Sequence, residues 1–407
     1  MRRVRFSRGL ESLETLAQTP TKKASLKRLK ELGLPDKKRE EYQYFDIESL
    51  LNREWEIVEP SSAGEIKESN KIVIIDGVVT EICEGVKIGC SNTVAIEKEH
   101  FDPLYYLSHT LCGDVISLQF SKDIKVKIEH HFTKQERLLA YRVALYIDPN
   151  SHVIIEESFY SSGATGAFII SGYDAFISRD SSLNLIKSET LEDYTPINSH
   201  SFIIDKNSSM SWRSFDFGDG SGLQLAQARL KKRASINSSH LLFATKEANR
   251  GTISKFIHEG ENSNSNQVAK SVLQDKSKGI FDALIKVENS AKYAIAHQNS
   301  KAILLNDGAY MASKPQLEIY IDELEASHGS TTGQLDKKAL FYLRSRGISQ
   351  NDARKMLILA FANELIEQIE SDEVKASIYR DFETFYYGKT KIECIESCHN
   401  CEEMILK

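Results

Sequence analysis

From about Lys71 to Tyr320 the chain is a succession of short runs of β-branched and aromatic residues, and this stretch constrains the fold more than any other feature. Runs such as IKVKIEHHF, HVIIEESFY, GAFIISG and AILLNDG follow one another with brief polar joints between them. The joints contain pairs such as Asp-Gly, Asn-Ser and Ser-Ser, which favour tight turns. We therefore expect a long all-β core with few helices.

Many of these runs carry apolar residues at alternate positions, as a strand does when one face is packed and the other is in water. A sandwich, a barrel and a parallel β-helix are all compatible with this pattern. The sequence has no clean short repeat, so periodicity alone does not select the β-helix.

Helical patterns flank the β block. Before it, from about Leu10 to Glu56, apolar residues such as Leu26 and Leu29 recur every three or four positions. We expect an N-terminal helical domain at residues 1–68, a β core at 69–332 and a C-terminal helical domain at 333–407.

After the β block, three residues mark the ends of two expected helices. Asp336 is placed to cap the helix DKKALFYLRSRG with its carboxylate, which stabilises a helix start by ~1 kcal/mol. Gly347 can end this helix in the left-handed conformation. Ser349, with Asp352 three positions on, can begin a second helix.

Composition narrows the class of protein. The chain is 41% hydrophobic and has a net charge of −6, which gives no argument for binding nucleic acid or an anionic membrane. No apolar run approaches the ~20 residues of a membrane span, and the basic first residues lack the apolar segment of a secretory signal. Six cysteines without an even framework favour a reducing compartment. We expect a soluble cytoplasmic protein without structural disulfides.

Common catalytic motifs are missing from the sequence. It contains no G-x-x-x-x-G-K-[ST] loop, no G-x-S-x-G nucleophile elbow and no H-E-x-x-H zinc motif. The glycines of SFDFGDGSGLQ predict a turn between strands. We interpret three histidines of the β block as hydrogen-bonded structural groups and its three cysteines as small buried hydrophobes; they are His109, His130, His131, Cys83, Cys90 and Cys112.

A different cysteine group lies near the C-terminus. The segment IECIESCHNCEE brings Cys394, Cys398, His399 and Cys401 within eight residues. Thiolate and imidazole are suitable donors for zinc or for an iron–sulfur cluster. Structural metal sites usually draw their ligands from two separate segments, whereas these four residues lie in one. Two interpretations therefore stay open: a metal site, and a reactive tail without function.

The segment EASHGSTTGQLDKKALFYLRSRG, Glu325 to Gly347, holds the only His-Gly pair of the chain. We read it as a Gly/Ser/Thr-rich corner before a helix, in which His328 is either a polar turn residue or a working residue. This segment, the adjoining KPQLEIYIDELEASHGSTTGQLD and the upstream SNSNQVAKSVLQDKSKGIFDALIKV together resemble the SufB/SufD family of iron–sulfur cluster assembly proteins. The position of the His-Gly pair is more similar to SufD than to SufB. REEYQYFDIESLL also resembles the N-terminal segment of SufD.

The resemblance implies a mainly β fold, with a right-handed parallel β-helix core flanked by N- and C-terminal helical domains. It implies a non-catalytic scaffold subunit that pairs with SufB, or with a second copy of itself, and binds the ATPase SufC. No tightly held cofactor is implied. Iron or a nascent Fe–S cluster would be held transiently at the interface between SufB and SufD.

The resemblance also implies roles for individual residues. His328 corresponds to the SufD histidine at the cluster-assembly interface. The SufC contact is expected on the C-terminal helices, at Leu340, Phe341, Leu343, Arg344, Met356 and Phe361. The chain has Ala326 where SufD commonly has a cysteine two residues before the histidine, so His328 would act with ligands from the partner alone.

Two alternatives stay open. One is a β-helix enzyme of the polysaccharide lyase type, which would need a carboxylate cluster for Ca²⁺, an Arg or Lys base and a secretory signal. The other is a stand-alone metal-binding protein that uses the C-terminal cysteines.

Overall fold

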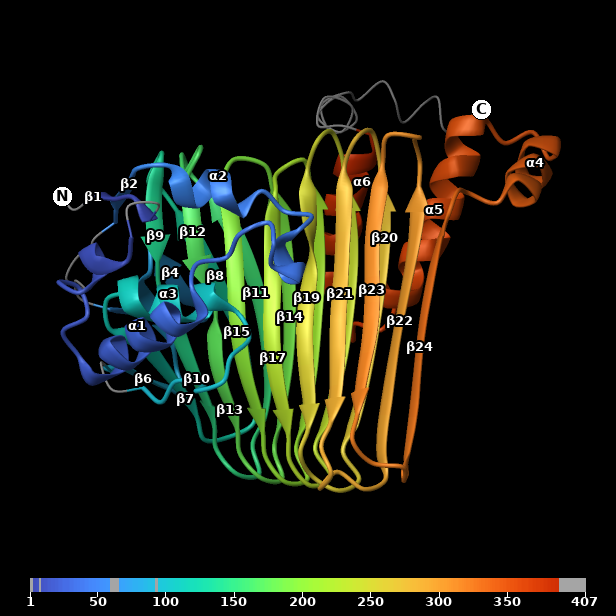
Figure 1. Ribbon diagram of the computed structural model, residues 1–407. Coiled ribbons are helices and arrows are strands. Elements are labelled where there is room, and N and C mark those ends of the chain that lie inside the picture. The colour runs from blue at the N-terminus through green and yellow to red at the C-terminus, as the bar shows by residue number, and fades with distance from the viewer. Residues whose placement is uncertain (1–2, 7–8, 59–65, 92–93, 388–407) are drawn as a thin grey trace.

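Two long β-sheets face each other in a parallel β-helix, with helices at both ends (Figure 1). The structure is a computed structural model that describes residues 3–6, 9–58, 66–91 and 94–387. Sheet A contains β1 (Arg3–Val4), β2 (Trp55–Ile57), β6 (Val86–Ser91), β7 (Val115–Phe120), β9 (Arg137–Ala140), β10 (Val143–Ile147), β12 (Phe168–Ser171), β13 (Tyr173–Ile177), β15 (Thr195–Ile204), β17 (Gly222–Leu230), β19 (Asn249–His258), β21 (Lys278–Val287) and β23 (Tyr310–Ile319). Sheet B contains β3 (Lys67–Ser69), β4 (Ile72–Ile75), β5 (Val78–Cys83), β8 (Ile124–Phe132), β11 (His152–Ser161), β14 (Ser182–Leu191), β16 (Ser209–Gly218), β18 (Ser235–Ala244), β20 (Asn264–Leu273), β22 (Ala294–Leu304) and β24 (Leu324–Gly333).

From β14 onward, each coil of the β-helix adds one strand to each sheet, in parallel register with the coil before it. The earlier coils add two short strands to sheet A, β9 with β10 and β12 with β13. In sheet B, His152 pairs with Ser182, Ser182 with Ser209, and Ser209 with Ser235, which places equivalent residues 30, 27 and 26 positions apart. Because the length of the coil varies, the sequence carries no constant repeat.

The turns between the coils form a row of left-handed residues. Six residues of this row have positive φ angles; they are Asn150, Asp180, Asn207, Arg233, Asn262 and Tyr293. The backbone N–H of each one donates to a carbonyl oxygen of the following coil, as Asn150 does to Arg179. Asn and Asp tolerate this conformation better than most residues, which explains why they occupy four of the six positions.

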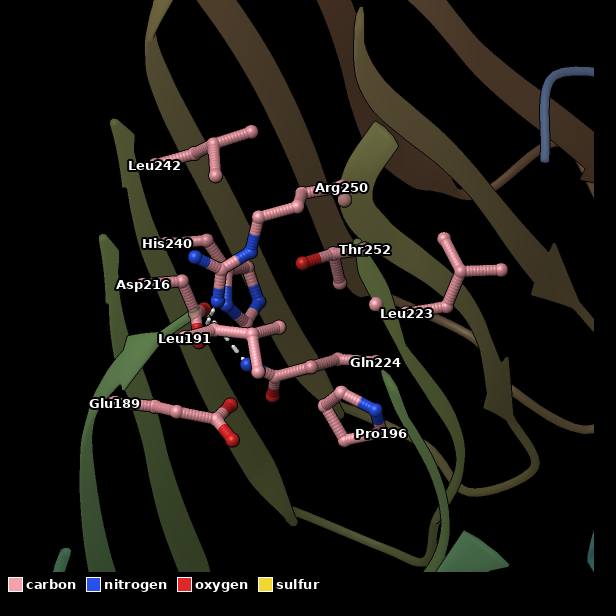
Figure 2. Close-up of a pocket in the computed structure, with 12 residues that line it drawn as sticks. Glu189, Leu191, Pro196, Asp216, Leu223, Gln224, His240, Leu242, Arg250 and Thr252 are labelled. Carbon is pink, nitrogen blue, oxygen red and sulfur yellow. Dashed lines mark hydrogen bonds and ion pairs between the residues drawn. The ribbon is translucent and has the colours of Figure 1, made fainter. Parts of the chain in front are cut away.

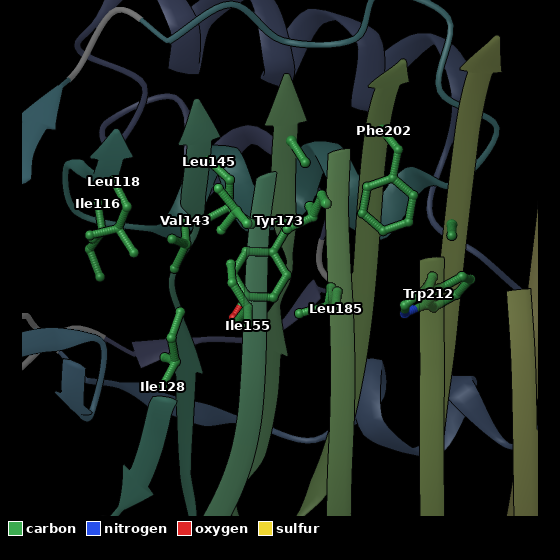
Figure 3. Packing of buried hydrophobic residues seen from close by; sticks show 14 of the residues in the cluster. Ile116, Leu118, Ile128, Val143, Leu145, Ile155, Tyr173, Leu185, Phe202 and Trp212 are labelled. Carbon is green, nitrogen blue, oxygen red and sulfur yellow. The ribbon is translucent and has the colours of Figure 1, made fainter. Parts of the chain in front are cut away.

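The space between the sheets is apolar toward the N-terminal coils. Figure 3 shows Ile128, Leu145, Tyr173, Leu185 and Trp212 packed there, each at most 2% exposed. Alternate positions of each strand supply these side chains, as the alternation in the sequence predicts.

Toward the C-terminal end, part of this interior becomes polar. One row of register partners runs along the inner face of sheet B through Ile155, Leu185, Trp212, Ser238, Gln267, Gln298 and His328. Gln267 and Gln298 are 1% and 2% exposed. The row therefore changes from apolar to polar before it reaches His328 in the last described strand.

Helices cover the outer faces of both sheets. The helical segments are η2 (Glu11–Leu13), α1 (Pro20–Leu32), η3 (Glu40–Tyr42), α2 (Ile47–Asn52), α3 (Pro103–Leu111), α4 (Lys337–Ser345), α5 (Gln350–Ile366) and α6 (Asp372–Tyr387). On sheet A, Leu29 of α1 and Tyr105 of α3 join one apolar cluster with Phe168. On sheet B, Ile358 of α5 and Phe382 of α6 pack against Phe217.

The expected fold, a mainly β chain with a parallel β-helix core and helices at both ends, is confirmed. The helix α3 lies inside the block that the sequence analysis described as strands. Asp102 caps it by accepting from the N–H groups of Leu104 and Tyr105, and Pro103 occupies its first position. The expected caps of the C-terminal helices are confirmed: Asp336 accepts from Lys338 and Ala339, and Ser349 accepts from Asp352.

Candidate functional site at the open end of the β-helix

The β-helix ends in two strands whose outer edges are unpaired within the described part of the chain. β23 pairs only with β21, and β24 pairs only with β22. Unpaired strand edges present rows of backbone N–H and C=O groups that can bond to another strand. In Figure 1 these two strands form the C-terminal face of the β-helix, below α4 and α5. This face is a surface suited to pairing with a second β-structure.

His328 lies on this face. It occupies the fifth position of β24, where it is the register partner of Gln298 on β22. The sequence interpretation of a Gly/Ser/Thr-rich corner was wrong, because residues 324–333 form a ten-residue strand. Small hydroxyl residues are accommodated there because the strand is exposed and its backbone bonds come from β22.

One hydrogen bond orients the His328 ring. Its Nδ1 lies 3.2 Å from the carbonyl oxygen of Pro315 on β23, so the ring points from sheet B toward sheet A. A carbonyl oxygen only accepts, so Nδ1 carries the hydrogen. In the neutral ring this leaves Nε2 with a lone pair, the form in which imidazole ligates metals.

The neighbourhood of His328 differs from a complete metal site. Ala326, two residues before His328, packs its methyl group with Ile285 and Ala296. His297 of β22 hydrogen bonds to Ser327 and lies near Glu325. It has no part in the contact between His328 and Pro315. No group of three or more His, Cys, Asp or Glu side chains that could hold a metal is present among the described residues.

The helix α4 exposes an apolar surface. None of its residues is buried, and the exposed fraction of Phe341 is 74%. Leu340 and Leu343 are half-buried and Arg344 is exposed. The hairpin between α4 and α5 turns at Gly347, whose φ angle of 87° is left-handed as the sequence predicts.

The two expected contact residues of α5 lie in different surroundings. Met356 is 48% exposed, whereas Phe361 packs against the apolar cluster between α5, α6 and sheet B. The Lys270 ammonium also lies 4.5 Å from the centre of the Phe361 ring. Phe361 therefore contributes to the attachment of α5, and a change at this position would affect folding as well as any contact with a partner.

The other chemistry-bearing residues divide into three groups. Cys394, Cys398, His399 and Cys401 lie outside the described residues. Cys83 and Cys112 are buried as expected, but Cys90 is exposed, so the prediction for Cys90 was wrong. His130 and His131 are hydrogen-bonded as expected, to Tyr141 and Glu129, and the His109 ring lies 3.1 Å from the carboxylate of Asp174.

Sequence reasoning missed a polar network inside the β-helix. Lys187 is 2% exposed and lies 2.6 Å from Glu189 and 3.2 Å from Asp216. Burial alone would lower the pKa of Lys187, but the two carboxylates raise it above its ordinary value. The alternation of polar and apolar residues in LNLIKSETL indicates a strand with two different faces. It does not indicate which of the two faces points inward.

The fold and this end face define an elongated parallel β-helix whose last two strands, β23 and β24, each have one unpaired edge within the described residues. Residues 130–361 match the family described as "SUF system FeS cluster assembly, SufBD core domain". This match covers more than half of the chain, and the chain belongs to that family.

Individual relatives agree with this assignment. The chain is 25% identical over 397 residues to the iron–sulfur cluster assembly protein SufD of Escherichia coli (strain K12), over 90% of this chain and 92% of that protein. It is 28% identical over 246 residues to SufD of Plasmodium berghei, over 59% of this chain and 18% of that protein. A SufBD family protein of Synechocystis is 38% identical over 104 residues, which are 26% of this chain and 23% of that protein. The resemblance to the SufB/SufD family, and most to SufD, is confirmed.

Among the described residues, no helix is long and apolar enough to cross a membrane.

Proposed function

We propose that this protein is a scaffold subunit of SUF iron–sulfur cluster assembly. It pairs through the open end of its β-helix with SufB, or with a second copy of itself, and binds the ATPase SufC through α4 and α5. It contributes binding surfaces to the assembly reaction, and nucleotide hydrolysis belongs to SufC.

The unpaired edges of β23 and β24 carry this proposal. A partner strand that adds to such an edge gains a ladder of backbone hydrogen bonds, and the alternate side chains decide which partner fits. Ten residues in each strand are long enough for several such bonds.

His328 is the residue of this face with the chemistry to hold iron. Its Nε2 atom is available for a metal because Nδ1 is engaged with Pro315. A single imidazole binds iron weakly, so the partner subunit has to supply the remaining ligands. A nascent cluster held in this way would lie between two subunits.

The test is anaerobic co-expression with SufB and SufC of the same organism, followed by size-exclusion chromatography with iron and sulfide analysis. We expect the wild-type chain to form a stable three-component complex that contains iron and sulfide. His328→Ala should still form the complex, because the exposed ring contributes little to folding. The iron content of this complex should be at least about tenfold lower than that of the wild type.

His297→Ala is the matched control. His297 lies on the neighbouring strand β22 with a similar imidazole, but it contacts Ser327 and not Pro315. It should keep both the complex and the iron. Wild-type iron content in His328→Ala would contradict the role of this residue, and elution of the wild-type chain alone would contradict the scaffold function.

The two alternatives from the sequence have no specific observation in their favour among the described residues. The lyase reading would be supported by cleavage of an acidic polysaccharide. The stand-alone metal reading rests on residues outside the described part of the chain, and metal analysis of Cys398→Ser tests it.

A further inference from the structure

The polar interior of the β-helix contains a small cavity that is separate from the open end. Its volume is about 20 Å³, which is room for one water molecule, since one needs about 10–15 Å³ on this measure. Figure 2 shows side chains from both sheets around it. The lining residues are Glu189, Leu191, Pro196, Asp216, Gly222, Leu223, Gln224, His240, Leu242, Arg250, Gly251 and Thr252.

Gln224 places an unsatisfied acceptor in this cavity. Its side chain is 4% exposed, and its Nε2 donates to the Oδ2 atom of Asp216 over 2.7 Å. Because a carboxylate accepts and cannot donate, this bond settles which end of the amide is nitrogen. The Oε1 atom of Gln224 has no hydrogen-bond partner. A buried acceptor without a partner costs about 1–3 kcal/mol, so the fold favours an occupant that donates a hydrogen bond to it.

The charges around the cavity balance. Glu189 and Asp216 supply two negative charges, and Lys187 and Arg250 supply two positive charges. The guanidinium of Arg250 also donates to the carbonyl oxygen of Phe217 over 2.6 Å. A cation in the cavity would lie beside this guanidinium, and an anion would lie beside two carboxylates.

His240 adds no charge and no spare donor. Burial lowers its pKa to about 4, so the ring is neutral near pH 7. Its two nitrogen atoms lie 2.8 Å from Ser214 and 2.6 Å from Ser238. The occupant of the cavity therefore has to be small, neutral and able to donate a hydrogen bond.

We infer that this cavity is a binding site for one ordered water molecule, which donates to Gln224 Oε1 and bridges the inner faces of sheets A and B. The water completes the hydrogen bonding of a polar network that includes Asp216 and Arg250. This inference rests on the geometry of the interior and is independent of the proposed function in cluster assembly.

A crystal structure of the full-length chain that resolves ordered water tests the inference. We expect one density peak in the cavity at hydrogen-bonding distance, about 2.7–3.0 Å, from Gln224 Oε1. A second crystal soaked in rubidium chloride should show no anomalous peak at this position. An anomalous peak would identify a monovalent-cation site and overturn the inference, as would an empty cavity.

A pair of variants tests the role of Gln224. Gln224→Met keeps the volume of the side chain and removes the acceptor, so the peak should disappear. Gln119→Met is the control, because Gln119 donates to Asp148 elsewhere in the β-helix, and it should keep the peak. A water that persists in Gln224→Met would show that Gln224 is not its anchor. If Gln224→Met does not fold, the wild-type and rubidium crystals still decide the inference.

Discussion

At the scale of single residues, the carboxylate of Asp174 holds α3 to sheet A. It is 1% exposed and accepts from the hydroxyl of Tyr105 over 2.7 Å. The Arg142 guanidinium and the His109 ring each lie 3.1 Å from its Oδ2 atom. Burial alone would raise the pKa of Asp174, but Arg142 and His109 hold it well below its ordinary range. The ionised carboxylate is thus part of the native packing.

Asp174→Asn should destabilise the protein by about 3–5 kcal/mol at pH 7, because it leaves Arg142 buried without a counter-charge. Since the native pKa is depressed, the contribution of Asp174 is present above the unfolded pKa of about 3.9 and is lost as the pH falls below it. Urea unfolding at several pH values measures this difference. Asp180→Asn is the control, because Asp180 is exposed and asparagine occupies equivalent turn positions. A loss below about 1 kcal/mol for Asp174→Asn would contradict this account.

The backbone conformation at position 218 requires glycine. Its φ angle is 131°, and an added Cβ would lie 2.1 Å from the carbonyl oxygen of Leu191. Gly218→Ala should therefore lower the free energy of unfolding by more than about 2 kcal/mol. Gly333→Ala, where a Cβ would meet nothing within 4 Å, should change it by less than about 0.5 kcal/mol. Equal melting temperatures for the two variants would show that the turn adjusts freely.

At the scale of elements, α4 depends on its cap more than on packing. The helix has nine residues, none of them buried, and isolated helices of this length are marginal in water. Asp336→Ala should cost α4 about 1 kcal/mol, and amide hydrogen exchange in residues 337–345 should accelerate about fivefold. The exchange of β22 should stay unchanged. Uniform protection of α4 in the variant would mean that another contact holds the helix.

Some strands could be recognised from the sequence and others could not, for a physical reason. Apolar runs such as those of β11 and β13 were recognised because their side chains alternate between core and solvent. Strands such as β18 (SINSSHLLFA) and β24 (LEASHGSTTG) were not, since Ser, Asn and His are typical of loops. These strands form because neighbouring strands satisfy their backbone groups, and because β18 faces a polar interior whereas β24 is mostly exposed. The helix α3 had a recognisable start at Asp102–Pro103, which the surrounding strands obscured.

At the scale of the whole molecule, the two proposed partner surfaces lie close to each other at the C-terminal end (Figure 1). The edges of β23 and β24 would bind one partner, and α4 with the exposed part of α5 would bind another. α5 and α6 also pack on the outer face of sheet B. A movement of α5 on binding of the proposed partner would therefore act on the strands β16, β18 and β20 of sheet B.

Phe341→Glu should reduce recovery of SufC in co-purification at least about tenfold, because a central aromatic residue at an interface contributes more than about 1.4 kcal/mol. Folding and pairing with SufB should be unaffected, since Phe341 is 74% exposed. Tyr160→Glu, an exposed aromatic residue on β11, serves as the control. Unchanged recovery of SufC would show that this face of α4 is not the contact.

Local features of the sequence determined much of this protein. The alternation of the runs, the Asn and Asp turn residues, and the caps at Asp336 and Ser349 follow from backbone sterics and hydrogen bonding within a few residues. Long specific segments were also enough to place the chain in its family. Arg233 and Tyr293 also adopt the left-handed backbone conformation, but their residue types do not predict it. Their conformation follows from their place in the row of turns.

Only the tertiary structure decided which residues meet. Gln298 and His328 are 30 positions apart, and Asp216 and Gln224 face each other from different sheets. Each coil has its own length, so no constant repeat in the sequence announces these pairs. Whether a polar side chain faces the interior or the solvent depends on the coils on either side of it. Those coils determined which polar residues line the interior and which residues surround His328, and Cys90 is exposed on the edge strand β6.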